Sequence, residues 1–141
     1  MSPEAHAPGS PADWLQHAHS DLALARTTPL PPILFEDLCF HAQQAAEKAI
    51  KAILVAYDIP VPRTHNLRTL FDLLLAEVSM PVDIQEAAGL SDYAVARRYP
   101  GASEPVEAEE CREAISMAEA VVDWAEKVID LRLHNAAPPL H

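Results

Sequence analysis

Residues 35–57 read FEDLCFHAQQAAEKAIKAILVAY, and this stretch contains no Gly or Pro. Its apolar residues recur at intervals of three and four, which at about 100° per residue places them on one face of a helix. Small side chains on that face let a neighbouring helix approach closely; they are Ala42, Ala45, Ala46 and Ala49. The stretch predicts a central helix, roughly 35 Å long at 1.5 Å per residue, against which other helices pack.

The opposite face of this helix is polar. It collects His41, Gln44, Lys48 and Lys51 at steps of three, four and three, with Gln43 and Glu47 beside them. One interpretation is a solvated face, which every amphipathic helix has. The other is a local anion site, because residues 48–100 hold six of the ten Lys and Arg and have a net charge of zero, whereas the whole chain has −11. The sequence leaves both interpretations open.

Four more apolar stripes at helical spacing predict helices over residues 11–27, 67–78, 82–98 and 103–133, with the central helix over 33–58. Ser10 and Ser103 are the expected N-caps of the first and last of these. Gly89 lies within the fourth, where it costs about 1 kcal/mol relative to Ala. The predicted fold is an all-α antiparallel up-and-down bundle of four to five helices over residues 10–133. The tails, residues 1–9 and 134–141, are predicted to be disordered.

Composition and charge restrict the class of protein. The 141 residues suffice for one domain, and a chain with 6% aromatic residues and 3 Gly suits helices packed on helices. No segment approaches the 18 or so apolar residues of a membrane span, and the first residues lack the basic flank and apolar run of a signal peptide. Cys39 and Cys111 each fall on an apolar face, as expected of buried thiols in a reducing compartment. We therefore expect a cytoplasmic protein without a disulfide, and the acidic net charge argues against general nucleic-acid affinity.

Known catalytic and metal-binding patterns are missing from the sequence. It has no Gly-rich phosphate loop, no CxxC and no HExxH. His17 and His19 are two residues apart, so a helix points them to different sides and they cannot chelate one ion together. No catalytic residue, metal site or cofactor is predicted.

A second candidate site lies at residues 93–100, YAVARRYP. Tyr93 and Arg97 are one helical turn apart, and Arg98 and Tyr99 follow. The planar fork of Arg suits phosphate, and Tyr offers a stacking surface. Alternatively, the Arg side chains cap the carbonyl groups at a helix end and Tyr99 packs on the core.

The last predicted helix has an unusually wide apolar face. Its main stripe is widened to about half of the circumference by Met117, Val121, Trp124 and Val128. A helix with a single core-facing side normally has a narrower apolar face. Either this helix is buried between several others, or these four residues meet a second chain, and we predict a homodimer.

Several of these segments together resemble the HEPN domain of prokaryotes. They are FHAQQAAEKAIKAIL (40–54), Thr64-His65-Asn66-Leu67, Leu90-x-x-Tyr93 and ARRYP (96–100), within a span of about residues 14–129. The resemblance implies an all-α bundle that tends to dimerise, that binds a nucleotide or RNA, and that works beside a minimal nucleotidyltransferase, sometimes as a toxin–antitoxin pair. It also implies a cleft lined by Lys48, Lys51, Arg97 and Tyr99 with His65 near its rim.

One departure from the family bears on catalysis. HEPN ribonucleases carry an Arg followed, after four to six residues, by a His, and none of the seven Arg residues here has a His at that spacing. The resemblance therefore favours a non-catalytic nucleotide-binding protein or nucleotidyltransferase partner. Two alternatives stay open: a HEPN ribonuclease with a non-standard active site, and a dimeric structural adaptor without a ligand.

Overall fold

The computed structural model describes residues 6–96 and 105–135. Helices account for most of this part of the chain, and it contains no strand, so the predicted all-α class is confirmed. The elements are α1 (Pro11–Ala25), α2 (Phe35–Ala56), α3 (Leu67–Leu74), α4 (Val82–Glu86), the 3-10 helix η1 (Ala87–Leu90), α5 (Ser91–Ala96) and α6 (Ala108–Asn135).

Side-chain caps explain where two of the helices begin. The Ser10 hydroxyl accepts a hydrogen bond from the Asp13 amide at 3.1 Å and caps α1, and the Asn66 side chain caps α3 through the amides of Arg68 and Thr69. The helix predicted over residues 82–98 is divided, because a 3-10 turn containing Gly89 separates α4 from α5. The last helix begins at Ala108, later than the predicted start near Ser103, which lies outside the described residues.

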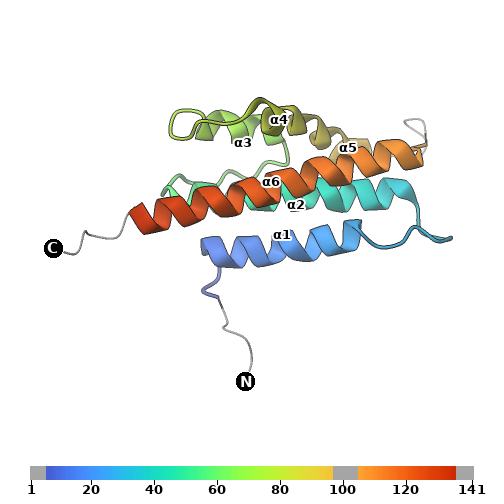
Figure 1. Cartoon of the computed structure of the whole chain (residues 1–141), viewed down its shortest axis with the longest axis horizontal. Coiled ribbons are helices and arrows are strands. Elements are labelled where there is room, and N and C mark those ends of the chain that lie inside the picture. Colours follow the sequence, from blue (N-terminus) through green and yellow to red (C-terminus); the bar gives the residue numbers. More distant parts are fainter. Residues whose placement is uncertain (1–5, 97–104, 136–141) are drawn as a thin grey trace, which may run out of the picture.

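The three long helices lie side by side (Figure 1), and α6 crosses in front of α2 in this view. Helix α1 is antiparallel to α2, but α2 and α6 run in the same direction. Their first turns meet at Cys39 and Cys111, and near their last turns the Arg132 guanidinium lies 4.5 Å from the centre of the Tyr57 ring. The segment of α4, η1 and α5 runs opposite to α2 and α6, so the chain reverses direction again before α6, and the predicted helical bundle is confirmed.

The core is built around α2. Four of its alanines, Ala42, Ala45, Ala46 and Ala49, are completely buried, and larger buried neighbours such as Ile50, Ile53 and Leu54 fill the space beside them. Small residues in the middle of a helix let α1 and α6 both pack closely against it. The side of α2 that carries polar residues is thereby left between α1 and the segment that leads to α3.

Membrane insertion has no candidate segment in the described part of the chain. None of its helices combines the length and the apolar character that a bilayer crossing requires.

Candidate functional site

Asp21 of α1 anchors the first part of a polar network on α2. It follows Ala18 and precedes Leu22 and Ala25 on the buried face of α1, so its carboxylate points at α2 and is itself only 7% exposed. One oxygen accepts a hydrogen bond from Nζ of Lys48, and the other lies 3.0 Å from Nδ1 of His41. The two helices are therefore joined by an ion pair and a histidine–carboxylate contact.

Glu47 anchors the second part of the network. Its carboxylate is 2% exposed and accepts hydrogen bonds from Nζ of Lys51 and Nε2 of Gln43, both at 2.8 Å. Nδ1 of His65 lies 3.0 Å from the same carboxylate, and Gln43 also donates to the main-chain carbonyl of His65 at 3.3 Å. Gln44 in turn donates to Gln43 at 2.8 Å. A buried carboxylate needs this many donors, since an unpaired one would be strongly destabilising.

The network is buried at its carboxylates and open at its histidines. The side chain of His65 is 55% exposed, and those of His41 and Lys48 are 29% and 26% exposed. Lys51 is deeper, and its ammonium group lies 5.6 Å from the centre of the Trp14 ring, a cation–π contact. A solute can therefore reach the two imidazole rings and the Lys48 ammonium group first.

Charge is balanced within the network. Asp21 and Glu47 neutralise Lys48 and Lys51, so the cluster has no excess positive charge unless a histidine is protonated. An anion that binds here must compete with a carboxylate for each ammonium group. The arrangement suits weak, displaceable anion binding better than a permanent phosphate clamp.

The structure brings together part of the predicted site and separates the rest. His41 and Lys48 contact Asp21, whereas Lys51 and His65 contact Glu47, and Gln44 is joined to Glu47 through Gln43. Arg97, Arg98 and Tyr99 lie outside the described residues.

Tyr93 belongs to another part of the molecule. Its hydroxyl donates to Glu110 of α6 at 2.6 Å, and its ring lies near the thiols of Cys39 and Cys111. Nine residues separate Cys39 from Lys48, which places them about 180° apart around α2. Tyr93 is therefore not part of the polar network around Lys48.

Asp21, Gln43, Glu47 and Trp14 are site residues that the sequence analysis did not select. A signal existed for three of them, because Asp21 interrupts an apolar stripe and the pair Gln43 and Glu47 lies one turn apart beside the apolar face of α2. A polar residue at an apolar position is the pattern expected of a buried hydrogen-bonding group.

The predicted dimer face on α6 is smaller than the sequence suggests. Val121 is 0% exposed and belongs to the core of its own chain, so it is not available to a partner. Met117, Trp124 and Val128 are partly buried against the same core. The reason is that η1 and α4 contact α6 and cover part of the wide apolar face.

Cys39 and Cys111 are neighbours in the core, both as free thiols. Burial raises the pKa of the Cys39 thiol far above its usual range, and the adjacent Cys111 adds to this effect. Burial likewise raises the pKa of Cys111. Thiols of this kind stay protonated and unreactive. Residues 6–96 and 105–135 contain no group of three His, Cys, Asp or Glu side chains placed to hold a metal ion.

The fold and the network define an all-α bundle protein with a paired polar cluster on its central helix. The family model of the HEPN domain matches residues 11–128. This chain therefore belongs to the HEPN domain family.

Two solved structures are similar to this chain along most of its length. The crystal structure of ST0689, an archaeal HEPN homologue, is 29% identical with a TM-score of 0.68, and the alignment covers 85% of this chain and 98% of that one. The crystal structure of TT1696 from Thermus thermophilus is 31% identical with a TM-score of 0.74 and the same two coverages. No curated protein matches this chain.

Proposed function

We propose that this chain is a non-catalytic HEPN-domain protein that binds a nucleotide at the polar network of α2 and acts as the partner of a minimal nucleotidyltransferase. The observation that supports a binding role is the accessible row of His41, Lys48 and His65, held in place by two buried carboxylates. Side chains that are already ordered lose little conformational entropy when a ligand binds. The nucleotidyltransferase partner is supported by the resemblance of this chain to HEPN proteins that work beside such enzymes.

Phosphate is the ligand group that suits this row. Each contact between an ammonium group and a phosphate oxygen is charge-assisted and stronger than a neutral hydrogen bond. Binding requires Lys48 to exchange Asp21 for phosphate, so the affinity is expected to be modest and to fall as the salt concentration rises.

Titration of ATP and of a short RNA into the protein tests whether the polar network binds a nucleotide. Lys48→Met should weaken binding, and Asp21→Asn should strengthen it, because the competing carboxylate is removed. Lys127→Met, on the exposed side of α6, is the matched control and should leave binding unchanged. No binding at millimolar ligand, or equal binding by all four proteins when each is folded, would reject the nucleotide site.

Co-expression tests the protein partner. A nucleotidyltransferase encoded beside this chain should co-elute with it in gel filtration, and its transfer activity should change in the complex. Separate elution at micromolar concentrations of both proteins would reject the partnership while leaving the nucleotide site standing.

A ribonuclease is the second candidate function, and one observation favours it. His41 and His65 each contact a buried carboxylate at 3.0 Å and remain accessible, which is how an imidazole is oriented for general acid–base catalysis. Cleavage of RNA in the presence of a chelator, lost in both His41→Gln and His65→Gln, would establish it. We favour the non-catalytic role because the Arg-to-His spacing of HEPN ribonucleases is missing.

A further inference from the structure

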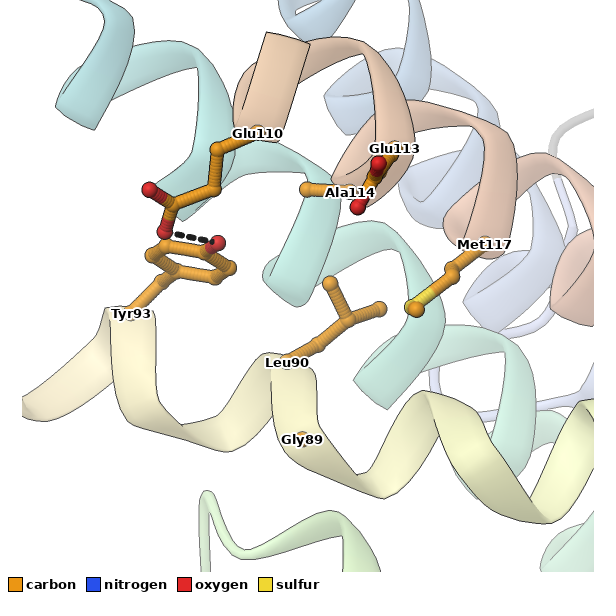
Figure 2. Close-up of a pocket in the computed structure, with 7 residues that line it drawn as sticks. All are labelled: Gly89, Leu90, Tyr93, Glu110, Glu113, Ala114 and Met117. Atoms are coloured by element: carbon orange, nitrogen blue, oxygen red, sulfur yellow. Dashed lines mark hydrogen bonds between the residues drawn. The ribbon is translucent and has the colours of Figure 1, made fainter. Parts of the chain in front are cut away.

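A hollow of about 170 Å³ lies between the first half of α6 and the segment formed by η1 and α5 (Figure 2). Tyr93, which borders it, is also near Cys39, on the side of α2 that faces away from Lys48. The hollow is therefore separate from the polar network, and the inference drawn from it does not depend on the proposed function.

The floor of the hollow is apolar. Leu90 and Met117 project toward one another from the two walls, and Ala114 of α6 lies above Leu90 (Figure 2). A cavity of about 150 Å³ lined by aliphatic side chains is known to hold a benzene ring. One six-membered ring or a short alkyl chain therefore fits this space.

The rim of the hollow carries two carboxylates. Glu110 and Glu113 are three residues apart on α6, so both side chains lie on the same side of the helix. In the described part of the chain neither forms an ion pair with Lys or Arg; the nearby Arg112 pairs with Glu109 instead. The Tyr93 hydroxyl holds one oxygen of Glu110 at 2.6 Å and leaves further acceptor positions on that carboxylate.

The Tyr93 hydroxyl donates to Glu110 in this arrangement. Burial and its hydrogen bond to Glu110 raise the pKa of Tyr93 above its usual range, so the proton stays on the phenol. Glu110 is thereby oriented over the hollow as an acceptor.

We propose that this hollow binds a small organic amine, with the apolar body of the amine against Leu90 and Met117 and its ammonium group on Glu110 and Glu113. A neutral ligand of the same shape gains the apolar contacts but leaves the carboxylates unpaired. An anionic ligand is repelled by them. Only a cation with an apolar body satisfies both parts of the hollow.

Three ligands with the same ring test the proposal: benzylamine, benzyl alcohol and benzoate. They are titrated into the isotope-labelled full chain while the NMR signals of Gly89, Leu90 and the Met117 methyl group are followed. Benzylamine should give saturable shifts confined to these residues, benzyl alcohol weaker ones, and benzoate none. The benzylamine shifts should diminish as the salt concentration rises.

Charge-neutralising variants locate the ammonium group. Glu110→Gln and Glu113→Gln should each weaken benzylamine binding by about two- to fivefold, the range expected when one exposed ion pair is lost. Asp123→Asn changes the net charge equally on the exposed side of α6 and should leave the binding unchanged. Comparison of each amide spectrum with the wild type shows that the variant is folded.

Three results would overturn the proposal. Equal binding of the three ligands, or an effect of Asp123→Asn as large as that of Glu113→Gln, would mean that the carboxylates do not select the ligand. Tighter binding of N-acetyl-lysine methylamide than of benzylamine would overturn the assignment to a free small amine. It would mean that the hollow binds the lysine side chain of a protein partner. Because ATP is titrated at another face, failure here is distinguishable from failure of the nucleotide site.

Discussion

Asp21 of α1 accepts a hydrogen bond from the ammonium group of Lys48 of α2, at a position where both side chains are mostly removed from water. The pair joins two helices that are also held by apolar contacts, by the His41–Asp21 contact and by the Lys51–Trp14 cation–π contact. It also keeps Lys48 occupied, so the residue best placed to meet an anion is restrained by its own neighbour. Stability and ligand affinity are therefore coupled through one carboxylate.

Removal of that carboxylate should destabilise the fold. Asp21→Ala leaves Lys48 without its partner and should lower the free energy of unfolding by about 1–3 kcal/mol, measured by urea denaturation. The double variant Asp21→Ala with Lys48→Met should recover part of this loss, because a partly buried ion pair can be replaced by apolar side chains. Additive losses in the double variant would show that the pair does not couple the helices.

The small-residue face of α2 should not tolerate a larger side chain. Ala49 is completely buried, so Ala49→Leu should overpack the core and cost about 1–3 kcal/mol of unfolding free energy. Ala23→Leu, at an exposed position of α1, introduces the same side chain and should change stability by less than about 0.5 kcal/mol. Equal melting temperatures for wild type and Ala49→Leu would mean that this face is not tightly packed.

Gly89 should be replaceable with a gain in stability. A Cβ atom added at this position meets no other atom within 4 Å, and the residue lies in a helical segment. Gly89→Ala restricts the unfolded chain and should raise the unfolding free energy by about 0.4–1 kcal/mol. A lower melting temperature for this variant would contradict the open space beside Gly89.

The thiol pair should make the protein lose stability in alkali. The folded-state pKa of Cys39 lies above the ordinary thiol value of 9.0, so only the unfolded chain releases this proton as the pH passes 9.0. The unfolding free energy should be insensitive to this group below that pH and should fall above it, by at most about 1.4 kcal/mol per pH unit for one thiol. Urea titrations from pH 8 to 11 should show a shallower decline for Cys39→Ala than for the wild type.

A homodimer through α6 remains a prediction. Trp124, Met117 and Val128 are only partly buried within one chain, and pairing with a second copy would complete their burial. Light scattering should give a mass of twice 15.4 kDa at micromolar concentration. Trp124→Glu should shift the mass toward that of one chain, whereas Ser116→Glu, at an exposed position of the same helix, should not.

The periodicity of apolar residues in the sequence was sufficient to predict the class of fold and the position of its central helix. The spacing of apolar residues in residues 35–57 predicts α2 to within about two residues at each end, and its alanines are buried as expected. The polar stripe of His41, Gln44, Lys48 and Lys51 is also visible, because a helix places residues three and four apart on one side. These features depend only on neighbours along the chain.

The tertiary structure alone decided which charges meet. Asp21 reaches Lys48 only because α1 packs against α2, and Glu47 reaches His65 only because the segment before α3 folds back over α2. The direction of α6, the burial of Val121 and the distance of Tyr93 from Lys48 follow from the path of α3 to α5, which no local spacing records. Periodicity specifies the face on which a side chain lies, whereas its partner is determined by contacts between residues far apart in the sequence.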